Sequence, residues 1–576
     1  MSTTTPPTRT RRRSITKTHD RISQLSWEPT YHDPVTRYPT RYHMPRKAKD
    51  PMKQIMREYL PMELEKDERV FGGHDAAVRS GMAEKASQRW LEILKPFVQV
   101  TNFAEVAAGR CMSLLIDAVP NPELRNGYHV QFLDEVRHTG LQMSLGRWYT
   151  KNAPEPYGWN IGAQALARDP VTGPGVNMLS HFMVGDPIQC AFTLMVVAET
   201  AFTNVAFVAL PDVGARNGDF ALPTTYLSVQ SDEARHISNG YATLLTVLQD
   251  DRNHDLIVRD LQQAWWINHA FLDPFTGAVM EYFSEDRSDP ECYRDKWDRW
   301  IRDDWYRAYI VKLGKLGVDI PPDMFERARK RILGGIHHRQ GMFGFASWML
   351  HFWRFPQYTE TDFEYFERNY PGWHDEYGDF FEAHNQLADP REGALMLSAF
   401  LAEAPPLCWT CQLPGVIDDD ITHRVCDAHG NNCSPSAEGA GTRFYCSKEC
   451  QWLDESNPGR YQGDRQWFDR YDGWELSEVV RDLGFIRPDG KTLIGQPHVN
   501  PDLPLWTLED LRRCEVEVTS PNRVAAQAMG LPVLNTSAGG RSNADLANAT
   551  LARNGFAGAP SPGGLRGETA LLAPRP

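Results

Sequence analysis

One short pattern, Asp-Glu-x-Arg-His, occurs twice in this sequence, at residues 134–138 and 232–236. In each copy the glutamate and the histidine are three residues apart, and on a helix this spacing places both side chains on one face. A carboxylate beside an imidazole binds divalent metal ions, and two such pairs can hold two ions between helices. The metal ligands predicted from the two copies are Glu135, His138, Glu233 and His236.

Two further glutamates complete this donor set. Glu105 and Glu199 each occur among small and apolar residues, at 102–108 and 196–202, where an unpaired carboxylate would be costly to bury. A bound metal removes that cost. The six residues together supply four carboxylates and two imidazoles, which suits two iron or manganese ions and matches the ferritin-like di-iron bundles. A single Glu-x-x-His is common on helix surfaces, but two identically framed copies and two glutamates in the right order favour a metal site.

The residues that frame the predicted ligands have their own expected roles. Asp134 and Asp232 directly precede the ligand glutamates and can accept the second ring N–H of a ligand histidine, which fixes its tautomer. Arg137 and Arg235 would hold the carboxylates from the side away from the metal.

Four long helical segments with prolines at their ends are predicted to position these residues, at 83–119, 122–151, 187–210 and 223–248. Helices rich in aromatic residues continue over 254–385. The predicted fold class is therefore mainly α: a ferritin-like di-iron four-helix bundle elaborated with further helices, with a small Cys-containing mixed appendage near the C-terminus. The predicted divisions are an N-terminal arm without sustained periodicity, a helical domain that carries the predicted di-iron site, a Cys-rich module and a disordered tail, at 1–80, 81–400, 401–520 and 521–576.

Composition excludes some partners and locations. The formal charge is 61 − 75 = −14, which argues against a nucleic-acid partner. The longest apolar stretch, 188–210, has Glu199 near its centre, and a carboxylate in mid-bilayer is costly, so a buried helix is expected and not a membrane span. No secretory signal is recognisable, and a cytoplasmic location is expected.

Two cysteine pairs predict a second, structural metal site. The arrangement is C-x2-C followed by C-x3-C, a pattern that can hold zinc. The alternative is a set of buried reduced thiols. The residues are Cys408, Cys411, Cys446 and Cys450.

The order E…DExRH…E…DExRH resembles the large (alpha) hydroxylase subunit of the soluble bacterial di-iron multicomponent monooxygenases, over most of residues 20–510. Several stretches are most similar to the propane 2-monooxygenase branch, namely 27–30, 116–123, 198–204, 229–233 and 489–499.

This resemblance implies roles for individual residues. Glu105, Glu135 and His138 would bind one iron, and the second Glu-x-x-His pair with Glu199 would bind the other, with Glu135 bridging. Three polar residues are expected to act in catalysis. Thr203 would deliver protons, and Asn204 and Gln230 would line a polar pore.

Residues within a turn or two of the ligands are predicted to line an apolar substrate pocket, although each one taken singly could equally be ordinary helix packing. Gln142 is assigned to the same pocket, and it stands where the methane enzymes have a cysteine, which argues against that branch. The set is Thr101, Ala104, Ala108, Gln142, Ala198, Phe202 and Phe207.

The resemblance further implies that the chain activates O2 and inserts one oxygen atom into a C–H bond, with propane to 2-propanol favoured and acetone, methyl ketones or phenol as alternatives. Expected partners are a homologous beta subunit in an alpha2beta2 assembly, an NADH-dependent flavin/iron–sulfur reductase and a small coupling protein. The weighed rivals are a ribonucleotide reductase radical subunit, a desaturase, a non-catalytic scaffold and an iron-storage bundle.

Overall fold

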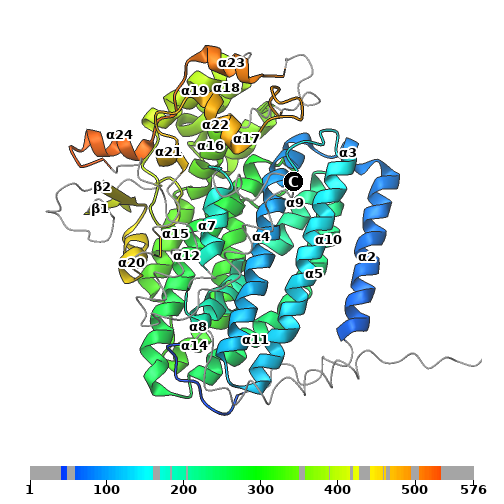
Figure 1. Cartoon of the computed structure of the whole chain (residues 1–576), viewed down its shortest axis with the longest axis vertical. Coiled ribbons are helices and arrows are strands. Elements are labelled where there is room, and N and C mark those ends of the chain that lie inside the picture. Colours follow the sequence, from blue (N-terminus) through cyan, green and yellow to red (C-terminus); the bar gives the residue numbers. More distant parts are fainter. Residues whose placement is uncertain are drawn as a thin grey trace, which may run out of the picture.

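Long helices running lengthwise form the body of the molecule, and shorter helices cover one end (Figure 1). The computed structural model describes residues 40–48, 59–159, 169–181, 185–202, 205–348, 357–387, 390–415, 420–426, 441–457, 460–461, 467–494 and 505–533. Its helices far outnumber its strands, so the predicted mainly α fold class is confirmed.

The body contains the predicted bundle helices. α5 packs along α4, η1 packs against both α11 and α12, and α12 also packs against α16. The elements are α2 (Tyr59–Ser80), α3 (Met82–Lys85), α4 (Gln88–Ala118), α5 (Pro122–Asn152), α7 (Gly173–His181), α8 (Pro187–Ala191), η1 (Phe192–Phe202), η2 (Val205–Ala209), α9 (Leu210–Arg216), α10 (Ala221–Gln230), α11 (Glu233–Val247) and α12 (His254–Tyr282).

The ends of these helices follow from local chemistry. The side chain of Ser87 accepts a hydrogen bond from the Trp90 backbone N–H and caps α4, and Asp186 caps α8 in the same way. Pro122 and Pro187 occupy the first turns of α5 and α8, where a missing N–H costs nothing.

Two predicted helices differ from the observed ones. In the segment 187–210, residues 187–202 and 205–210 are helical, but Phe192–Phe202 and Val205–Ala209 are π-helix, a wider form that often occurs at functional sites. The segment 223–248 is broken between α10 and α11, directly before Glu233.

A 22-residue helix, α2, lies within the predicted N-terminal arm and packs against α10 (Figure 1). Its buried positions include the polar residues Glu63 and His74. Because a polar residue occupies part of the buried face, the helix lacks the apolar periodicity from which helices are predicted.

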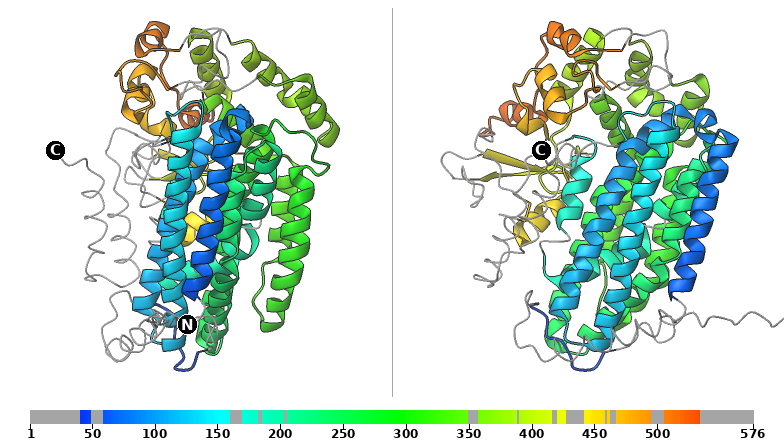
Figure 2. Two further views of the ribbon diagram at one scale, coloured as in Figure 1. Left: turned by 90° about the vertical axis from the view of Figure 1, so that its right-hand side faces the viewer. Right: turned by 45° about the vertical axis from the view of Figure 1, so that its right-hand side comes forward.

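The later helices surround α12 and then cover one end of the body, where α17, α19, α22 and α23 lie together (Figures 1 and 2). Stacked aromatic rings pack against α12, such as Trp305 on Trp265 with centroids 4.9 Å apart. The elements are α13 (Tyr293–Trp297), η4 (Asp298–Ile310), α14 (Val311–Leu313), α15 (Pro322–Leu333), α16 (Ile336–Trp348), α17 (Glu360–Asn369), η6 (His374–Gly378), α18 (Asp379–Asn385) and α19 (Pro390–Glu403), with short 3-10 turns η3 (Asp251–Asn253) and η5 (Gly314–Leu316).

The Cys-containing module is small and mixed, as predicted. An antiparallel pair, β1 (Thr422–Cys426) and β2 (Gly441–Tyr445), aligns Thr422 with Tyr445. The helices that follow are α20 (Lys448–Ser456), α21 (Trp467–Arg470), α22 (Leu476–Leu483), α23 (Leu508–Cys514) and α24 (Pro521–Ala528).

The predicted disordered tail begins too early. α24 lies at its start, with Ser520 as its N-cap, and Asn522 accepts a 2.7 Å hydrogen bond from the Leu407 backbone N–H. These partners were not recognisable in the Ala- and Asn-rich sequence. Residues 534–576 lie outside the described residues.

Among the described residues, no single helix has both the length and the apolar composition to cross a bilayer. The bent pair Pro187–Phe202 and Ala206–Arg216 meets that test only when its two parts are combined. The first part is buried in the protein and carries Glu199.

Candidate metal centre between four helices

α4 and α5 bring the first half of the predicted ligand set together. His138 Nδ1 lies 3.6 Å from Oε2 of Glu105 and 3.6 Å from Oε2 of Glu135. The two helices are close here, because a Cβ placed on Gly109 of α4 would lie 3.3 Å from the Glu135 Cβ. All three predicted ligands are buried. Gly109 has no side chain, so α4 and α5 can approach closely enough to enclose them.

η1 and α11 bring the second half together on the other side of Glu135. His236 Nδ1 lies 3.2 Å from Oε2 of Glu233, 3.5 Å from Oε1 of Glu199 and 3.5 Å from Oε1 of Glu135. The two carboxylate oxygens of Glu135 therefore face different histidines. All six predicted ligands lie in one buried cluster in which Glu135 is central.

Glu199 is presented by a π-helix, not by the regular helix that the sequence predicted. α11 passes this segment at very short range, since a Cβ on Gly240 would lie 2.6 Å from the Met195 Cβ and 3.0 Å from its backbone carbonyl carbon. The wider turn and the glycine together let the backbone that carries Glu199 approach the helix that carries His236.

The aspartates of the two motifs bind the histidines crosswise. Asp232 Oδ2 is 3.0 Å from Nε2 of His138, and Asp134 Oδ2 is 3.2 Å from Nε2 of His236. Each aspartate thus holds the histidine of the other motif, and leaves that histidine's Nδ1 facing the glutamates. The sequence predicted the type of contact but left the pairing open.

The motif arginines secure these aspartates. Arg137 Nη1 donates to Asp232 at 2.8 Å. Arg235 Nη2 donates to both Asp134 and Asp232 at 2.7 Å. The arginines therefore hold the carboxylates of the two aspartates, on the side away from the predicted ligands.

α2 also contributes to this outer layer, which sequence reasoning missed. Tyr59 donates a 2.8 Å hydrogen bond to Asp134, Glu63 accepts a 2.9 Å hydrogen bond from Arg235, and Lys66 forms an ion pair with Asp232. The spacing 59, 63, 66 on one helix face was the available signal, but it is polar and so resembles a solvated face.

Two buried amides contact the glutamates directly. Gln131 Nε2 lies 3.3 Å from Glu135 and 3.2 Å from Glu199 and joins the two carboxylates. Gln142 Nε2 lies 3.4 Å from Glu105. Sequence reasoning missed Gln131, although it lies one helical turn before Glu135.

Thr101, predicted as a pocket residue, belongs to the same polar chain. Its hydroxyl lies 3.4 Å from Gln142 Oε1 and accepts a 2.8 Å hydrogen bond from the Tyr226 hydroxyl. Thr101 and Gln142 are therefore close to Glu105, as expected, but they are engaged in hydrogen bonds.

Burial sets the charges of the cluster. It raises the pKa of Glu135 and of Glu233 to about 7 and that of Glu199 to about 6, although the nearby histidines oppose the shift. Burial disfavours the imidazolium of His138 and His236, but the surrounding carboxylates outweigh it and raise the pKa of each histidine well above its usual value.

His138 provides a test of whether a cation fits. Its Nδ1 is fully buried, has no hydrogen-bond partner and faces carboxylate oxygens of Glu105 and Glu135. When Nε2 donates its proton to Asp232, Nδ1 presents a lone pair to two carboxylates. A divalent cation between these three groups satisfies all of them, and the oxygen and imidazole donors suit iron.

The other predicted pocket and catalytic residues have varied surroundings. Ala108 and Ala198 are buried beside the cluster, while Ala104 is half-buried. The remaining rings pack on aromatic neighbours: Phe202 lies 5.5 Å from Trp265 and Phe207 lies 5.1 Å from Tyr226, measured between centroids.

Gln230 is half-buried at the end of α10. Thr203 and Asn204 lie outside the described residues.

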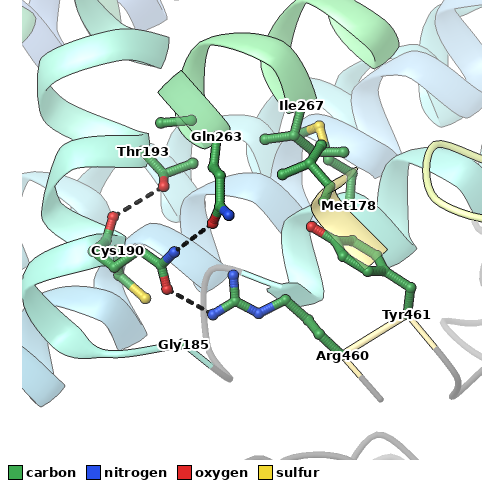
Figure 3. Close-up of a pocket in the computed structure, with 11 residues that line it drawn as sticks. Met178, Gly185, Cys190, Thr193, Gln263, Ile267, Arg460 and Tyr461 are labelled. Atoms are coloured by element: carbon green, nitrogen blue, oxygen red, sulfur yellow. Dashed lines mark hydrogen bonds between the residues drawn. The ribbon is translucent and has the colours of Figure 1, made fainter. Parts of the chain in front are cut away.

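A small cavity lies away from the predicted pocket residues, and none of them lines it (Figure 3). Its lining includes residues of α8, η1 and α12 together with Arg460 and Tyr461, and its volume is about 20 Å³. That volume is enough for one water molecule.

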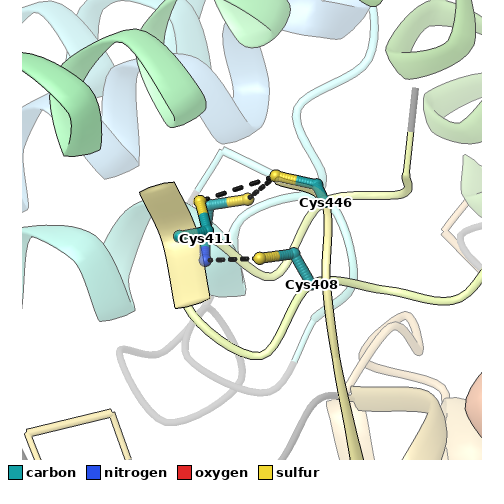
Figure 4. A group of neighbouring side chains, drawn as sticks. Cys408, Cys411 and Cys446 are labelled. Atoms are coloured by element: carbon teal, nitrogen blue, oxygen red, sulfur yellow. Dashed lines mark hydrogen bonds between the residues drawn. The ribbon is translucent and has the colours of Figure 1, made fainter. Parts of the chain in front are cut away.

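The four predicted cysteines converge in a separate buried cluster (Figure 4). Cys446 Sγ lies 3.8 Å from Cys411 Sγ and 3.5 Å from Cys450 Sγ. Cys408 Sγ accepts a 3.5 Å hydrogen bond from the Cys411 backbone N–H. Four sulfurs at about 2.3 Å from one zinc ion are about 3.8 Å apart, so the cluster has the size of a tetrahedral site.

Known proteins resemble this chain over nearly its whole length. Residues 27–251 match the family described as Methane/Phenol/Alkene Hydroxylase. The propane 2-monooxygenase hydroxylase component large subunit of Rhodococcus jostii (strain RHA1) is 44% identical over 87% of this chain and 93% of that protein. The methane monooxygenase component A alpha chain of Methylosinus trichosporium is 34% identical, over 86% and 92% of the two chains.

A solved structure shares the fold. The crystal structure of xenon-pressurized phenol hydroxylase from Pseudomonas sp. OX1 matches with a TM-score of 0.66 and 20% identity, over 80% of this chain and 92% of that chain. These similarities confirm the family resemblance recognised in the motifs.

Proposed function

Because this chain belongs to the family of hydroxylase large subunits of multicomponent di-iron monooxygenases, we propose that it hydroxylates small hydrocarbons, with propane to 2-propanol as its main reaction. The observation that carries the proposal is the position of Glu135, whose two oxygens face the histidines of both motifs. Relatives named as propane 2-monooxygenases support the choice of substrate.

We assign one iron to Glu105, Glu135 and His138. The other is assigned to Glu199, Glu233 and His236, with Glu135 shared between them. Iron bound there would supply the reduction of O2 and the oxidation of the C–H bond.

The protein's part in this chemistry is to place and orient the donors. Asp232 and Asp134 accept the Nε2–H of His138 and His236, so that each Nδ1 lone pair faces the glutamates. Gln131 donates to Glu135 and Glu199 and holds the two carboxylates at a fixed separation.

The substrate would bind beside Ala108 and Ala198, whose small side chains leave room next to the glutamates. Thr203 follows Glu199 by four residues in the sequence, and we assign it proton delivery to the metal site. Asn204 and Gln230 are assigned to a polar path into the site. Their support is their position in the sequence relative to the ligands.

Further components are required, because the relatives are named as one component of larger systems. We propose a beta subunit in an alpha2beta2 assembly, an NADH-dependent flavin/iron–sulfur reductase that supplies electrons, and a small coupling protein.

We also propose that Cys408, Cys411, Cys446 and Cys450 bind one structural zinc ion. The support is their burial and their sulfur separations of 3.5 and 3.8 Å. The zinc would stabilise the Cys-containing module and would take no part in catalysis.

The decisive experiment is product analysis of the iron-loaded chain with its partner components, supplied separately with propane, acetone and phenol. We expect mainly 2-propanol from propane. A hydroxylated ketone or phenol with little product from propane would keep the monooxygenase activity and replace the proposed substrate. No product from any of the three, with loaded iron and a working reductase, would overturn the proposed function.

A further inference from the structure

Arg331 of α15 is a buried cation directly beside the cysteine cluster. Its side chain is only 2% exposed, and Nη2 lies 3.4 Å from Cys446 Sγ. The guanidinium carbon lies 5.4 Å from the centroid of the Trp266 ring. The guanidinium therefore has an aromatic ring and a thiol sulfur as neighbours, deep inside the protein.

Two other buried arginines of this chain face carboxylates. Arg89 pairs with Asp362 at 3.2 Å and Arg443 pairs with Asp454 at 2.9 Å. Within the described part of the chain, Arg331 forms no ion pair with a carboxylate, and its Nη1 has no hydrogen-bond partner. A buried charge without a counter-charge is strongly destabilising.

Four neutral thiols would leave this charge unanswered, because S–H is only a weak hydrogen-bonding group. A divalent metal held by four thiolates changes the balance, since the unit then carries a formal charge of about −2. The sulfur that Arg331 approaches becomes an anionic acceptor. The same arrangement that is unfavourable with thiols is favourable with a metal–thiolate unit.

We infer that Arg331 is the counter-cation of a metal–tetrathiolate site, supplied by the helical body to a cluster whose ligands all belong to the Cys-containing module. The inference rests on the zinc site proposed above. Arg331 is a positioning residue: it binds no metal but stabilises the thiolate form of Cys446, so that the site is electrostatically complete only when the module is docked on α15.

α15 supplies matched control residues. Arg327 forms an ion pair with Glu449 of α20, so it also joins α15 to the Cys-containing module, through a carboxylate and not through sulfur. Arg329 is partly exposed and pairs with Asp298 on η4. Arg327→Met therefore tests loss of docking, and Arg329→Met tests loss of a charge on the same helix.

The test uses the full-length chain with cobalt(II) substituted at the cysteine site. Removing a positive charge next to a thiolate raises the energy of its lone pairs, so Arg331→Met should shift the thiolate-to-cobalt charge-transfer band to lower energy. Release of zinc to a chelator should become roughly 10- to 100-fold faster, the usual effect of losing a residue that holds a metal ligand. Arg331→Lys, which keeps the charge, should restore most of the band position.

The outcomes separate this inference from the zinc proposal. A shifted band in Arg331→Met, with wild-type bands in Arg327→Met and Arg329→Met, supports the inference. A wild-type band and release rate in Arg331→Met overturns it while leaving the zinc site intact. Metal content that is unchanged by Cys408→Ser and Cys446→Ser overturns both. If Arg331→Met does not fold, Arg331→Gln replaces it: a shifted band in Arg331→Gln that is largely restored in Arg331→Lys supports the inference, and a wild-type band in Arg331→Gln overturns it.

Discussion

The two halves of the carboxylate–histidine cluster carry the same motif on different backbones. In the first half, α4 and α5 are regular helices, and His138 Nδ1 is 3.6 Å from each nearby glutamate oxygen. In the second half, η1 is a π-helix, and His236 Nδ1 is 3.2–3.5 Å from three glutamates. The second half is therefore more tightly assembled around its histidine.

This difference shows what the repeated motif determines and what it leaves to its surroundings. The motif fixes a glutamate, a histidine and an aspartate on one helix. Because Asp134 binds His236 and Asp232 binds His138, neither half can be altered without moving the other. The distinct environments of the two metal positions come from η1, Gln131 and Gln142, which have no repeated counterpart.

Removal of a ligand should have the largest effect, and the loss should be greater for the glutamate shared by both halves than for one that belongs to a single half. We expect Glu199→Ala to lower the iron content and abolish turnover. Glu135→Ala should lower the iron content further, because Glu135 faces both histidines. Iron per chain by elemental analysis and product formation measure both. Glu123→Ala, three helical turns before Glu135 on α5, is the control, and full iron loading with activity in Glu199→Ala would refute the ligand assignment.

The crossed aspartates should have the next largest effect. Asp134→Asn and Asp232→Asn each leave the ligands in place but weaken the hold on one histidine, and we expect roughly 10- to 100-fold weaker iron binding. Mössbauer spectra of the iron-57 protein distinguish the two positions. Asp134→Asn should disturb the iron next to His236, and a disturbance confined to the iron next to His138 would contradict the crossed arrangement.

The sequence was sufficient to predict the mainly α fold and the six residues that converge. Glu135 and His138 are separated by a spacing that the α-helix period converts directly into proximity, and Glu105 and Glu199 were recognisable because they interrupt apolar runs. Cys408, Cys411, Cys446 and Cys450 were recognisable from their paired spacing. In each case the signal is local and the number of compatible structures is small.

The features that the sequence did not predict depend on contacts between distant segments. The buried face of α2 is polar because Glu63 and Lys66 pair with motif residues more than 160 positions away. The π-helical segment η1 meets α11 at very short range at Gly240, a contact that the sequence of neither segment specifies. Arg331 resembles a surface residue until the cysteine module is placed beside it.

The substrate range of the enzyme can be compared between variants at one alanine from each half. We expect Ala108→Phe to reduce oxidation of phenol roughly tenfold or more relative to propane, because the larger side chain removes space next to Glu105, while iron content stays unchanged. Ala198→Phe should have the same direction of effect if the substrate lies between the halves. Product ratios with substrates of increasing size measure both, and ratios unchanged in Ala108→Phe would place the pocket elsewhere.

The smallest effects should come from the glycines where each pair of helices meets, and they sharpen the contrast in packing. A Cβ at position 240 would lie 2.6 Å from the Met195 Cβ and 3.0 Å from the Met195 backbone carbonyl carbon, so the backbone of η1 or α11 must move to accept it. Gly240→Ala should therefore lower the free energy of unfolding by about 1–3 kcal/mol. A Cβ at position 109 would lie 3.3 Å from the Glu135 Cβ, which is a milder contact. Replacing a glycine inside a helix with alanine raises the free energy of unfolding by about 0.5–1 kcal/mol, and this should offset most of the strain from that contact.

Thermal unfolding of the two alanine variants measures this difference, with Gly140→Ala as the control, since a Cβ there meets nothing within 4 Å. Gly240→Ala should unfold at a lower temperature than Gly109→Ala, and Gly140→Ala should be at least as stable as the wild type. Equal losses at positions 109 and 240 would mean that the π-helix yields as readily as a regular helix, and that the closer assembly of the second half does not arise from this contact.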